Sequence, residues 1–370
     1  MHNRSGCEKT VVADSKTGRE IWRMTNHPAH DLHTYYDACS WSPDGSRIAF
    51  TSIRPEDVVP DKLTTTPKGA LFVMDANGAN IRCLDKEVDF ELHTGCLPIW
   101  KDDETIIYRA NGHTCMIDIN TGEIREIEGL MSRYLSPNGS RLICQWSASD
   151  SDERGVYIVD LEDFSREKVV LSGDLTEVML DLFNRTYRMP DMDEDKMGPP
   201  QVANIKWSPD GAKLMLRFNY TPDQYMKSLF VLNPDGSGLK RLDLVRPSFG
   251  HHSWHPDGER ILYCDQNEIG GGHVYYMIDR DGYDREVVHR KTLGSHPLFN
   301  PEGTEIVDFG NGYIWHLEVE TGKVRKLASY TNHLHSGLHP HPSWSPDGSK
   351  VIYHSDHTGT SQIYVIPLKP

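Results

Sequence analysis

The ten residues Trp41–Phe50, WSPDGSRIAF, place a tight turn directly before a short apolar run. Proline fixes φ at the first central position of a turn, and Asp-Gly supplies a polar residue followed by one that tolerates a left-handed backbone. The run after the turn, SRIAF, carries the β-branched and aromatic residues that are typical of a half-buried strand. This stretch therefore predicts two antiparallel strands joined by a hairpin.

The same pattern recurs along the chain. An aromatic or apolar residue, a polar residue and Pro-Asp-Gly or a close variant precede an apolar run at Trp41–Gly45, Leu135–Gly139, Trp207–Gly211, Trp254–Gly258, Phe299–Gly303 and Trp344–Gly348. A seventh, degenerate copy, WKDDE at Trp100–Glu104, precedes the run TIIY. Repeats of about 45 residues that hold several short strands are typical of β-propeller blades.

Further strands follow each hairpin, as in LFVMDANGANIRCLD and CMIDINTGEIREIE, so each repeat holds four. Seven such units predict an all-β fold, a seven-bladed β-propeller of four-stranded blades. The chain ends on what resembles a third strand, Gln362–Leu368, and begins with TVVADSKTGREIWRMT, which matches a turn and an outer strand. We predict that the N-terminal strand joins the C-terminal blade and closes the ring, which removes exposed sheet edges.

Residues 1–370 are predicted to form this single propeller domain, with an insertion at approximately 171–200 between the third and fourth blades. The turn prolines Pro137 and Pro209 are 72 residues apart, whereas Pro256, Pro301 and Pro346 follow one another at intervals of 45. Long loops inside compact domains often bind or cover ligands. A solvated decoration of the surface is an equal alternative for this insertion.

Composition excludes several classes of function. The formal net charge of −15 disfavours binding to nucleic acid or to an anionic membrane, although a local basic pocket for an acidic ligand is compatible with it. No apolar run reaches the length of about eighteen residues that a membrane-spanning helix needs, and the start, MHNRSGCEKT, lacks a signal-peptide core. Seven cysteines without a CxxC pair indicate neither a disulfide framework nor a zinc cluster. These features predict a cytoplasmic protein.

Histidine is unusually frequent, and its placement follows the repeat. The strand that leads into each turn is expected to line the central channel, and the position five residues before the turn proline is His251, His296 and His341 in three consecutive blades. His339 lies two residues before His341, so strand alternation puts both on the same side. Neutral imidazoles that converge on a channel mouth can bind a divalent transition metal and leave positions open for a substrate. A single histidine is more often a surface or turn residue, which is the prediction for His255, His273, His354 and His357.

Other signatures of catalysis are missing from the sequence. It has no GxSxG elbow, no Walker loop and no dinucleotide-binding fingerprint after a strand. Paired carboxylates such as Asp102 and Asp103 fall in turns, where solvated acid is the favoured interpretation. The histidine cluster is therefore the main chemical signal in the chain.

At these histidines the sequence resembles the oligogalacturonate lyase family, polysaccharide lyase family 22, whose members are seven-bladed propellers. The resemblance is sharpest over roughly Phe249–Pro346, in HHSWHPDG, GSHPLFNPEG and LHPHPSWSPDG, and HPHPS is its most specific part. The WSPDG repeats alone would indicate only a propeller, shared with Tol-type proteins and many others.

The resemblance implies a site. In the family a manganese ion is held by three histidines and a glutamine, and another histidine is the proposed base. By motif position, His296, His339 and His341 are the implied ligands of Mn²⁺ or another divalent metal, and His251 is the implied base. Ser336 stands where the family has its glutamine, so the fourth ligand is left open between Ser336, His335 and water.

A second departure is Asn204, which stands where another histidine is expected in the fourth blade, and the two departures leave the exact uronate substrate open. The implied reaction is β-elimination, in which a base removes the proton next to a uronate carboxylate and the 4-linked sugar leaves. An arginine that binds the substrate carboxylate through two hydrogen bonds would assist this elimination. Arg185 and Arg188 in the insertion are candidates, although no motif selects them.

The leading hypothesis is thus a metal-dependent lyase that acts on a small acidic oligosaccharide, a short 4-linked uronate, with neither a nucleic-acid nor a membrane partner. One alternative is a non-catalytic propeller that binds a protein or a sugar. Another is a metal-assisted hydrolase that uses the same ligands. The sequence does not determine the oligomeric state.

Overall fold

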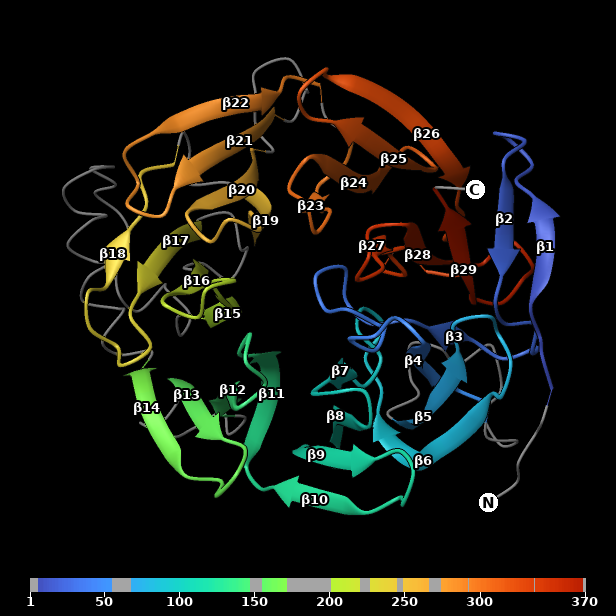
Figure 1. Cartoon of the computed structure of the whole chain (residues 1–370), viewed down its shortest axis with the longest axis horizontal. Coiled ribbons are helices and arrows are strands. Elements are labelled where there is room, and N and C mark those ends of the chain that lie inside the picture. The colour runs from blue at the N-terminus through green and yellow to red at the C-terminus, as the bar shows by residue number, and fades with distance from the viewer. Residues whose placement is uncertain are drawn as a thin grey trace, which may run out of the picture.

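The blades of a propeller are arranged around one axis in the computed structural model (Figure 1), which describes residues 6–54, 68–146, 155–171, 201–219, 227–244, 249–265, 274–291, 293–335 and 337–368. Seven antiparallel sheets follow one another around the ring. The predicted insertion, apart from Leu171, lies outside the described residues, as do Arg185, Arg188, His273 and Ser336.

The first three blades follow in chain order, each with four strands. Blade 1 holds β3 (Asp31–Leu32), β4 (Arg47–Ser52), β5 (Lys68–Asp75) and β6 (Arg82–Asp89). Blade 2 holds β7 (Ile99–Trp100), β8 (Thr105–Ala110), β9 (His113–Asp118) and β10 (Ile124–Ile127). Blade 3 holds β11 (Leu130–Leu135), β12 (Arg141–Trp146), β13 (Gly155–Asp160) and β14 (Arg166–Leu171).

The next three blades repeat the arrangement, with the first strand nearest the axis (Figure 1). Blade 4 holds β15 (Gln201–Trp207), β16 (Leu214–Asn219), β17 (Lys227–Leu232) and β18 (Lys240–Arg241). Blade 5 holds β19 (Phe249–Trp254), β20 (Arg260–Asp265), β21 (Val274–Asp279) and β22 (Arg285–His289). Blade 6 holds β23 (Leu298–Phe299), β24 (Glu305–Gly310), β25 (Tyr313–Glu318) and β26 (Lys323–Ser329).

Blade 7 closes the ring with strands from both ends of the chain. Its order is β1 (Thr10–Ala13), β2 (Glu20–Arg23), β29 (Gln362–Pro367), β28 (Lys350–Ser355) and β27 (Ser343–Trp344). The pair Trp22↔Val365 joins β2 to β29. The predicted closure is confirmed, with the difference that the N-terminal segment adds two strands. β1 folds back on β2 because the Asp14 carboxylate accepts hydrogen bonds from the backbone of the connecting turn, for example from Thr17 N at 2.7 Å.

The Pro-Asp-Gly turns have the predicted hairpin geometry. In the first, Gly45 adopts a φ of 71° and its N–H donates to the Ser42 carbonyl at 2.8 Å, while the Ser42 hydroxyl donates to Asp44 at 2.6 Å. The glycines of the other five Pro-Asp-Gly-type turns, Gly139, Gly211, Gly258, Gly303 and Gly348, also have positive φ. The position after Pro-Asp in these turns thus has a left-handed backbone, which glycine adopts without steric cost.

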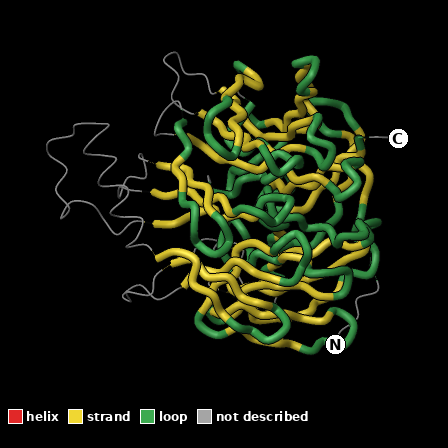
Figure 2. Tube along the Cα trace, turned by 60° about the vertical axis from the view of Figure 1, so that its left-hand side comes forward, coloured by secondary structure: helices red, strands yellow, loops and turns green. Residues whose placement is uncertain are grey.

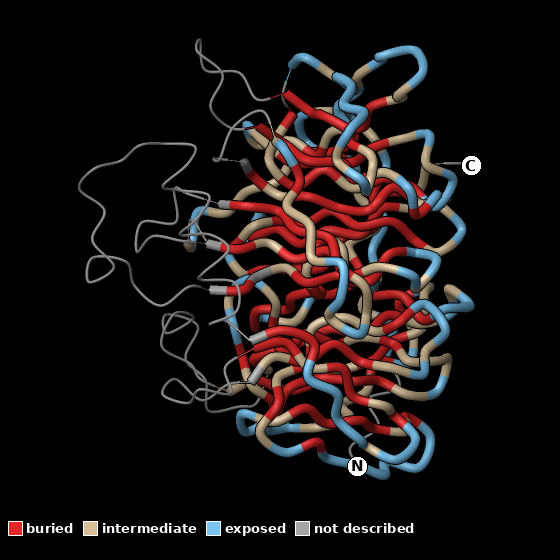
Figure 3. The backbone as a smooth tube through the Cα atoms, turned by 90° about the vertical axis from the view of Figure 1, so that its left-hand side faces the viewer, coloured by how far each residue is buried: buried red, intermediate tan, exposed pale blue. Residues whose placement is uncertain are grey.

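The apolar core lies between successive blades. Met215 and Leu229 of blade 4 pack with Ile261 and Tyr263 of blade 5 in one such layer, and similar layers recur around the ring. Figure 3 shows buried strands through the interior and exposed chain at the rims. Each blade therefore buries its two faces against its neighbours. The ends of the inner strands, near the axis, are not part of this core and can hold functional side chains.

Strands and loops make up the described residues, as Figure 2 shows. Within these ranges there is no helix with the length and apolar character that crossing a membrane would require.

Arg54 fastens the N-terminal segment to blade 1. Its guanidinium lies 2.8 Å from Glu8 Oε1 and 2.6 Å from Asp31 Oδ2, and the Asp31 side chain is fully buried. Arg54→Ala would leave a buried carboxylate unpaired, so we expect the free energy of unfolding in a denaturant titration to fall by about 3 to 5 kcal/mol. The control Lys68→Ala removes the partly exposed pair with Asp89 and should lower the free energy of unfolding by about 1 kcal/mol or less. Equal losses in the two variants would contradict this role of Arg54.

Candidate functional site

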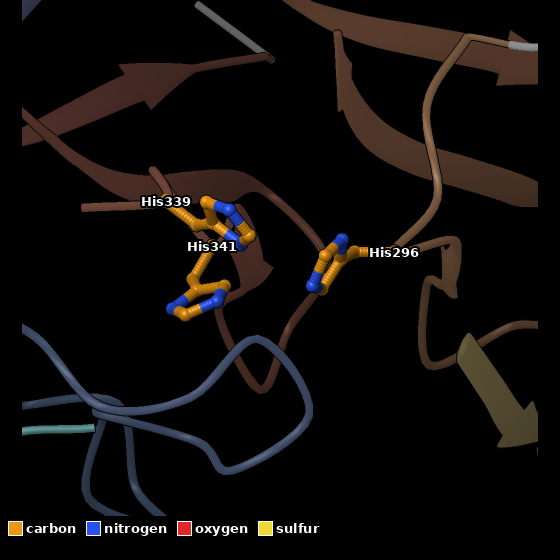
Figure 4. Close-up of side chains that lie close together, drawn as sticks. All are labelled: His296, His339 and His341. Atoms are coloured by element: carbon orange, nitrogen blue, oxygen red, sulfur yellow. The ribbon is translucent and has the colours of Figure 1, made fainter. Parts of the chain in front are cut away.

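Three histidines from two neighbouring blades meet close to the axis. His296 precedes β23, and His339 and His341 precede β27. One ring nitrogen from each lies within 4.8 Å of the others, and Figure 4 shows the three rings turned toward one another. The structure thus brings together the three residues that the sequence proposed as metal ligands.

The nitrogens of this cluster fit a divalent transition metal. His296 Nδ1 lies 3.0 Å from the Ser295 hydroxyl, whereas its Nε2 is buried without a hydrogen-bond partner among the described residues. His341 is fully buried and neither of its ring nitrogens has such a partner there. Burial, followed by the neighbouring imidazoles, lowers the pKa of His296 and of His341 well below the usual value. Neutral rings with unused lone pairs are the form in which histidine binds a metal.

The local backbone differs from the strand that the sequence suggested. Strand β27 covers only Ser343–Trp344, and His341 has a left-handed φ of 46°. Strand alternation is therefore the wrong reason for the convergence of His339 and His341. An irregular backbone instead turns both rings to the same site, and such conformations in residues other than glycine concentrate at functional sites.

Two buried histidines hold the loop that carries His339 and His341. His33 Nε2 donates to the Pro340 carbonyl at 3.1 Å, and His354 N donates to the same carbonyl at 3.1 Å. The His354 ring lies 5.0 Å from that of His33. The prediction of a surface position for His354 is wrong, because β28 packs directly against this loop and buries the ring.

A buried carboxylate positions His296. Asp308 Oδ1 accepts a hydrogen bond from His296 N at 3.0 Å, and Oδ2 accepts one from the Tyr275 hydroxyl at 2.5 Å. Burial raises the pKa of Asp308 to about 7, although hydrogen bonds from Tyr275 and from backbone N–H groups oppose the shift. Gly294 lies two residues before His296, and its backbone packs closely against Phe309. A Cβ at this position would lie 1.8 Å from the Phe309 carbonyl oxygen, so only glycine fits there.

His251, the implied base, lies on β19 beside the cluster. Its ring stacks on that of His296 with centroids 3.6 Å apart. The Nδ1 atom lies 2.9 Å from the Ser295 carbonyl oxygen, which can only accept, so Nδ1 carries the proton and Nε2 keeps the lone pair. Burial and then the charge of Arg217 lower the pKa of His251 well below its usual value. The neighbouring His252 is fully buried, with Nε2 3.4 Å from the Asn204 carbonyl oxygen.

An aromatic loop that no sequence motif indicated enters the site. Residues 33–40 lead from β3 toward the first turn, and the Tyr35 ring lies 4.8 Å from His341 while the Tyr36 ring lies 5.2 Å from His296. A loop in the N-terminal blue is visible beside the histidines in Figure 4. Counting back five residues from Pro43, as in the other blades, gives Ala38 instead of a tyrosine, because the count assumes a regular inner strand.

Buried ionic groups connect this loop to blade 4. Lys206 on β15 pairs with Asp37, whose carboxylate also accepts a hydrogen bond from the Tyr134 hydroxyl at 2.6 Å. The side chains of Lys206 and Asp37 are 6% and 5% exposed, so the pair is nearly dry. A pair desolvated to this degree fixes the loop against the opposite blade.

Three arginines also lie near Tyr134. Arg109, Arg133 and Arg217 come from blades 2, 3 and 4 and all interact electrostatically with Tyr134. Arg109 also lies 3.4 Å from Glu91, whereas the buried Nε of Arg217 has no hydrogen-bond partner among the described residues. The charges of Arg217 and Lys206 also act on His251, so a protein with a net charge of −15 places these two basic side chains near its histidine cluster.

The fourth ligand stays a prediction. Ser336 lies outside the described residues, and His335 Nδ1 accepts a hydrogen bond from Gly337 N at 2.9 Å. The exposed His93, which the sequence did not single out, lies beside the cluster, with its ring 4.7 Å from that of His339 and 5.8 Å from that of His341.

Comparison with known proteins agrees with this architecture. A solved oligogalacturonate lyase from Vibrio parahaemolyticus superposes with a TM-score of 0.75 at 16% identity, over 98% of this chain and 96% of that one. This chain has the fold of an oligogalacturonate lyase. An oligogalacturonate lyase in complex with manganese gives the same TM-score and coverage.

Sequence similarity to such lyases is partial. An oligogalacturonide lyase of Pectobacterium atrosepticum is 23% identical over 162 residues, which are 37% of this chain and 42% of that protein. An uncharacterised protein of Agrobacterium fabrum is 28% identical over 151 residues, 40% of this chain and 48% of its own length. The alignments thus span less than half the length of these relatives, and no protein-family model matches the chain.

Proposed function

We propose that this protein is a metal-dependent lyase that cleaves short 4-linked uronate oligosaccharides by β-elimination. The observation that carries the proposal is the convergence of His296, His339 and His341 beside His251, in the fold of an oligogalacturonate lyase. Mn²⁺ is the proposed metal, since an oligogalacturonate lyase of the same fold was solved with manganese. Bound at this cluster, the cation would neutralise the uronate carboxylate and make the neighbouring C5 proton more acidic.

His251 is the proposed base. Its Nδ1 is committed to the Ser295 carbonyl, which leaves the Nε2 lone pair for the C5 proton. The stacking on His296 and the hydrogen bond fix the ring, so proton abstraction needs no reorientation of the base.

Arg217 is the residue proposed to bind a substrate carboxylate. Arg185 and Arg188 were the candidates for this role in the sequence. Its guanidinium is close enough to His251 and Lys206 to affect their pKa values, and its buried Nε has no partner among the described residues. An acidic ligand would satisfy this charge, whereas a neutral sugar would leave it uncompensated.

An absorbance assay tests the proposal. With a panel of uronate disaccharides, the protein supplied with Mn²⁺ should produce an ultraviolet-absorbing product, because elimination creates a C4–C5 double bond conjugated to the carboxylate. The same protein after chelation should lose this activity. New reducing ends without absorbance would instead support a metal-assisted hydrolase. Absence of both metal binding and turnover would support a propeller that only binds a protein or a sugar.

A further inference from the structure

His93 lies as close to two of the proposed metal ligands as the three proposed ligands lie to one another. Its ring centroid is 4.7 Å from that of His339 and 5.8 Å from that of His341. The three rings of the cluster are separated by 5.3, 5.4 and 5.6 Å. His93 also interacts electrostatically with His296. A further imidazole, from the connection between β6 and β7, thus stands at the edge of the cluster.

A tight turn fixes the backbone that carries His93. The Glu91 carbonyl accepts a hydrogen bond from Gly95 N at 2.7 Å, and Gly95 has a left-handed φ of 58°. A Cβ on Gly95 would lie 2.3 Å from the Thr51 hydroxyl oxygen, and this oxygen accepts a hydrogen bond from Cys96 N at 2.9 Å. The turn is therefore anchored to β4 of blade 1.

One apolar cluster brings this turn and the loop of the proposed ligands together. Leu338 directly precedes His339, and Leu92 directly precedes His93. Both leucines pack in the same cluster, which also contains Ala29, Leu32, Ile53 and Phe90. The His93 ring lies against the backbone of the loop, because a Cβ on Gly337 would lie 3.1 Å from His93 Cε1. The proximity of His93 and His339 thus follows from the packing of their neighbours.

The His93 side chain is available to a ligand. No hydrogen bond ties its ring to another group in the part of the chain that the structure describes. The side chain is exposed, and exposed side chains change rotamer within nanoseconds, so the ring can turn toward a cation. His335, one of the earlier candidates for the fourth ligand, already accepts a hydrogen bond at Nδ1 from Gly337 N.

We propose that His93 is the fourth protein ligand of the metal, at the position left open between Ser336, His335 and water. This inference rests on the metal site of the proposed lyase function. The nitrogens of His296, His339 and His341 already converge without His93, whose exposed ring would turn to complete the set. A further imidazole is a ligand that suits divalent transition metals.

Calorimetry and pulsed EPR with Mn²⁺ test the assignment. Pulsed EPR counts the nitrogens that are bound directly to Mn²⁺, and this count should fall from four in the wild type to three in His93→Ala. Removal of a group that only orients a ligand costs about 10- to 100-fold in affinity, so His93→Ala should weaken Mn²⁺ binding by about tenfold or more. His335→Ala is the control and should keep both the affinity and the four nitrogens. The melting temperature of metal-free His93→Ala should match the wild type, because the side chain is exposed.

A conservative variant separates a ligand from a structural residue. His93→Gln offers an amide oxygen instead of a ring nitrogen, so it should recover part of the affinity while the nitrogen count stays at three. A wild-type count of three, or an unchanged affinity in His93→Ala, would overturn the role of His93. Wild-type protein that binds no Mn²⁺ would overturn the metal-dependent function itself, and this role with it. Four bound nitrogens in a protein that cleaves no uronate would support His93 as a ligand and contradict only the lyase activity.

Discussion

Replacing His251 with alanine should reduce the turnover of a uronate disaccharide by on the order of 10²-fold or more, while metal binding is retained. The residue lies against the histidine cluster, but the group of mutually close nitrogens consists of His296, His339 and His341 without it. Its Nδ1 is held by the Ser295 carbonyl, so Nε2 is the ring nitrogen that keeps its lone pair and can act as a base. Turnover is measured by absorbance and bound metal by elemental analysis of the purified variant.

His252→Ala is the matched control. This neighbour is fully buried, its Nε2 lies 3.4 Å from the Asn204 carbonyl oxygen, and it is not one of the three histidines whose nitrogens converge, so its loss should lower the melting temperature more than kcat. If His251→Ala lost its metal together with its activity, the residue would be a ligand and the base would lie elsewhere. Full activity of His251→Ala on a confirmed substrate would contradict the proposed mechanism.

Replacing His341 with alanine should abolish stoichiometric binding of Mn²⁺, with an affinity loss of more than about 100-fold. Removal of groups that only orient metal ligands already costs about 10- to 100-fold, and His341 is a proposed ligand. Both of its ring nitrogens are buried without a hydrogen-bond partner among the described residues, so the variant loses no such bond in the free protein. Isothermal titration with Mn²⁺ gives the affinity directly.

His357→Ala on the same blade is the control, because this exposed histidine bonds to Ser329 and lies outside the group of converging nitrogens. It should bind Mn²⁺ as the wild type does. Wild-type protein that stays free of metal after Mn²⁺ is supplied would show that the ligand assignment is wrong.

The repeat determined most of the fold. Pro-Asp-Gly turns need specific backbone angles that few other sequences adopt, so their recurrence located six of the seven hairpins and predicted the blades. The closing strands were predictable for a related reason, since a blade with only three strands at the C-terminus leaves an edge that must be paired. That the N-terminus adds β1 as well as β2 follows from the local turn around Asp14.

The site was only partly predictable. Counting back from the turn proline found His251, His296 and His341. In regular blades the same number of residues separates the turn from the position that faces the axis. The same count gave Ala38 in blade 1, where the 33–40 loop instead brings in Tyr35 and Tyr36. It also carried no information on Arg217, which lies on the second strand of its blade.

The number of blades and the histidines that follow the repeat could thus be predicted from local patterns, because both depend on backbone conformations that a few neighbouring residues specify. Which groups meet those histidines depends on tertiary packing. The buried Lys206–Asp37 pair, the orientation of Tyr35 and the burial of His354 each join segments far apart in the chain. Such contacts depend on how the blades and their loops pack around the axis, and no local pattern of residues encodes that packing.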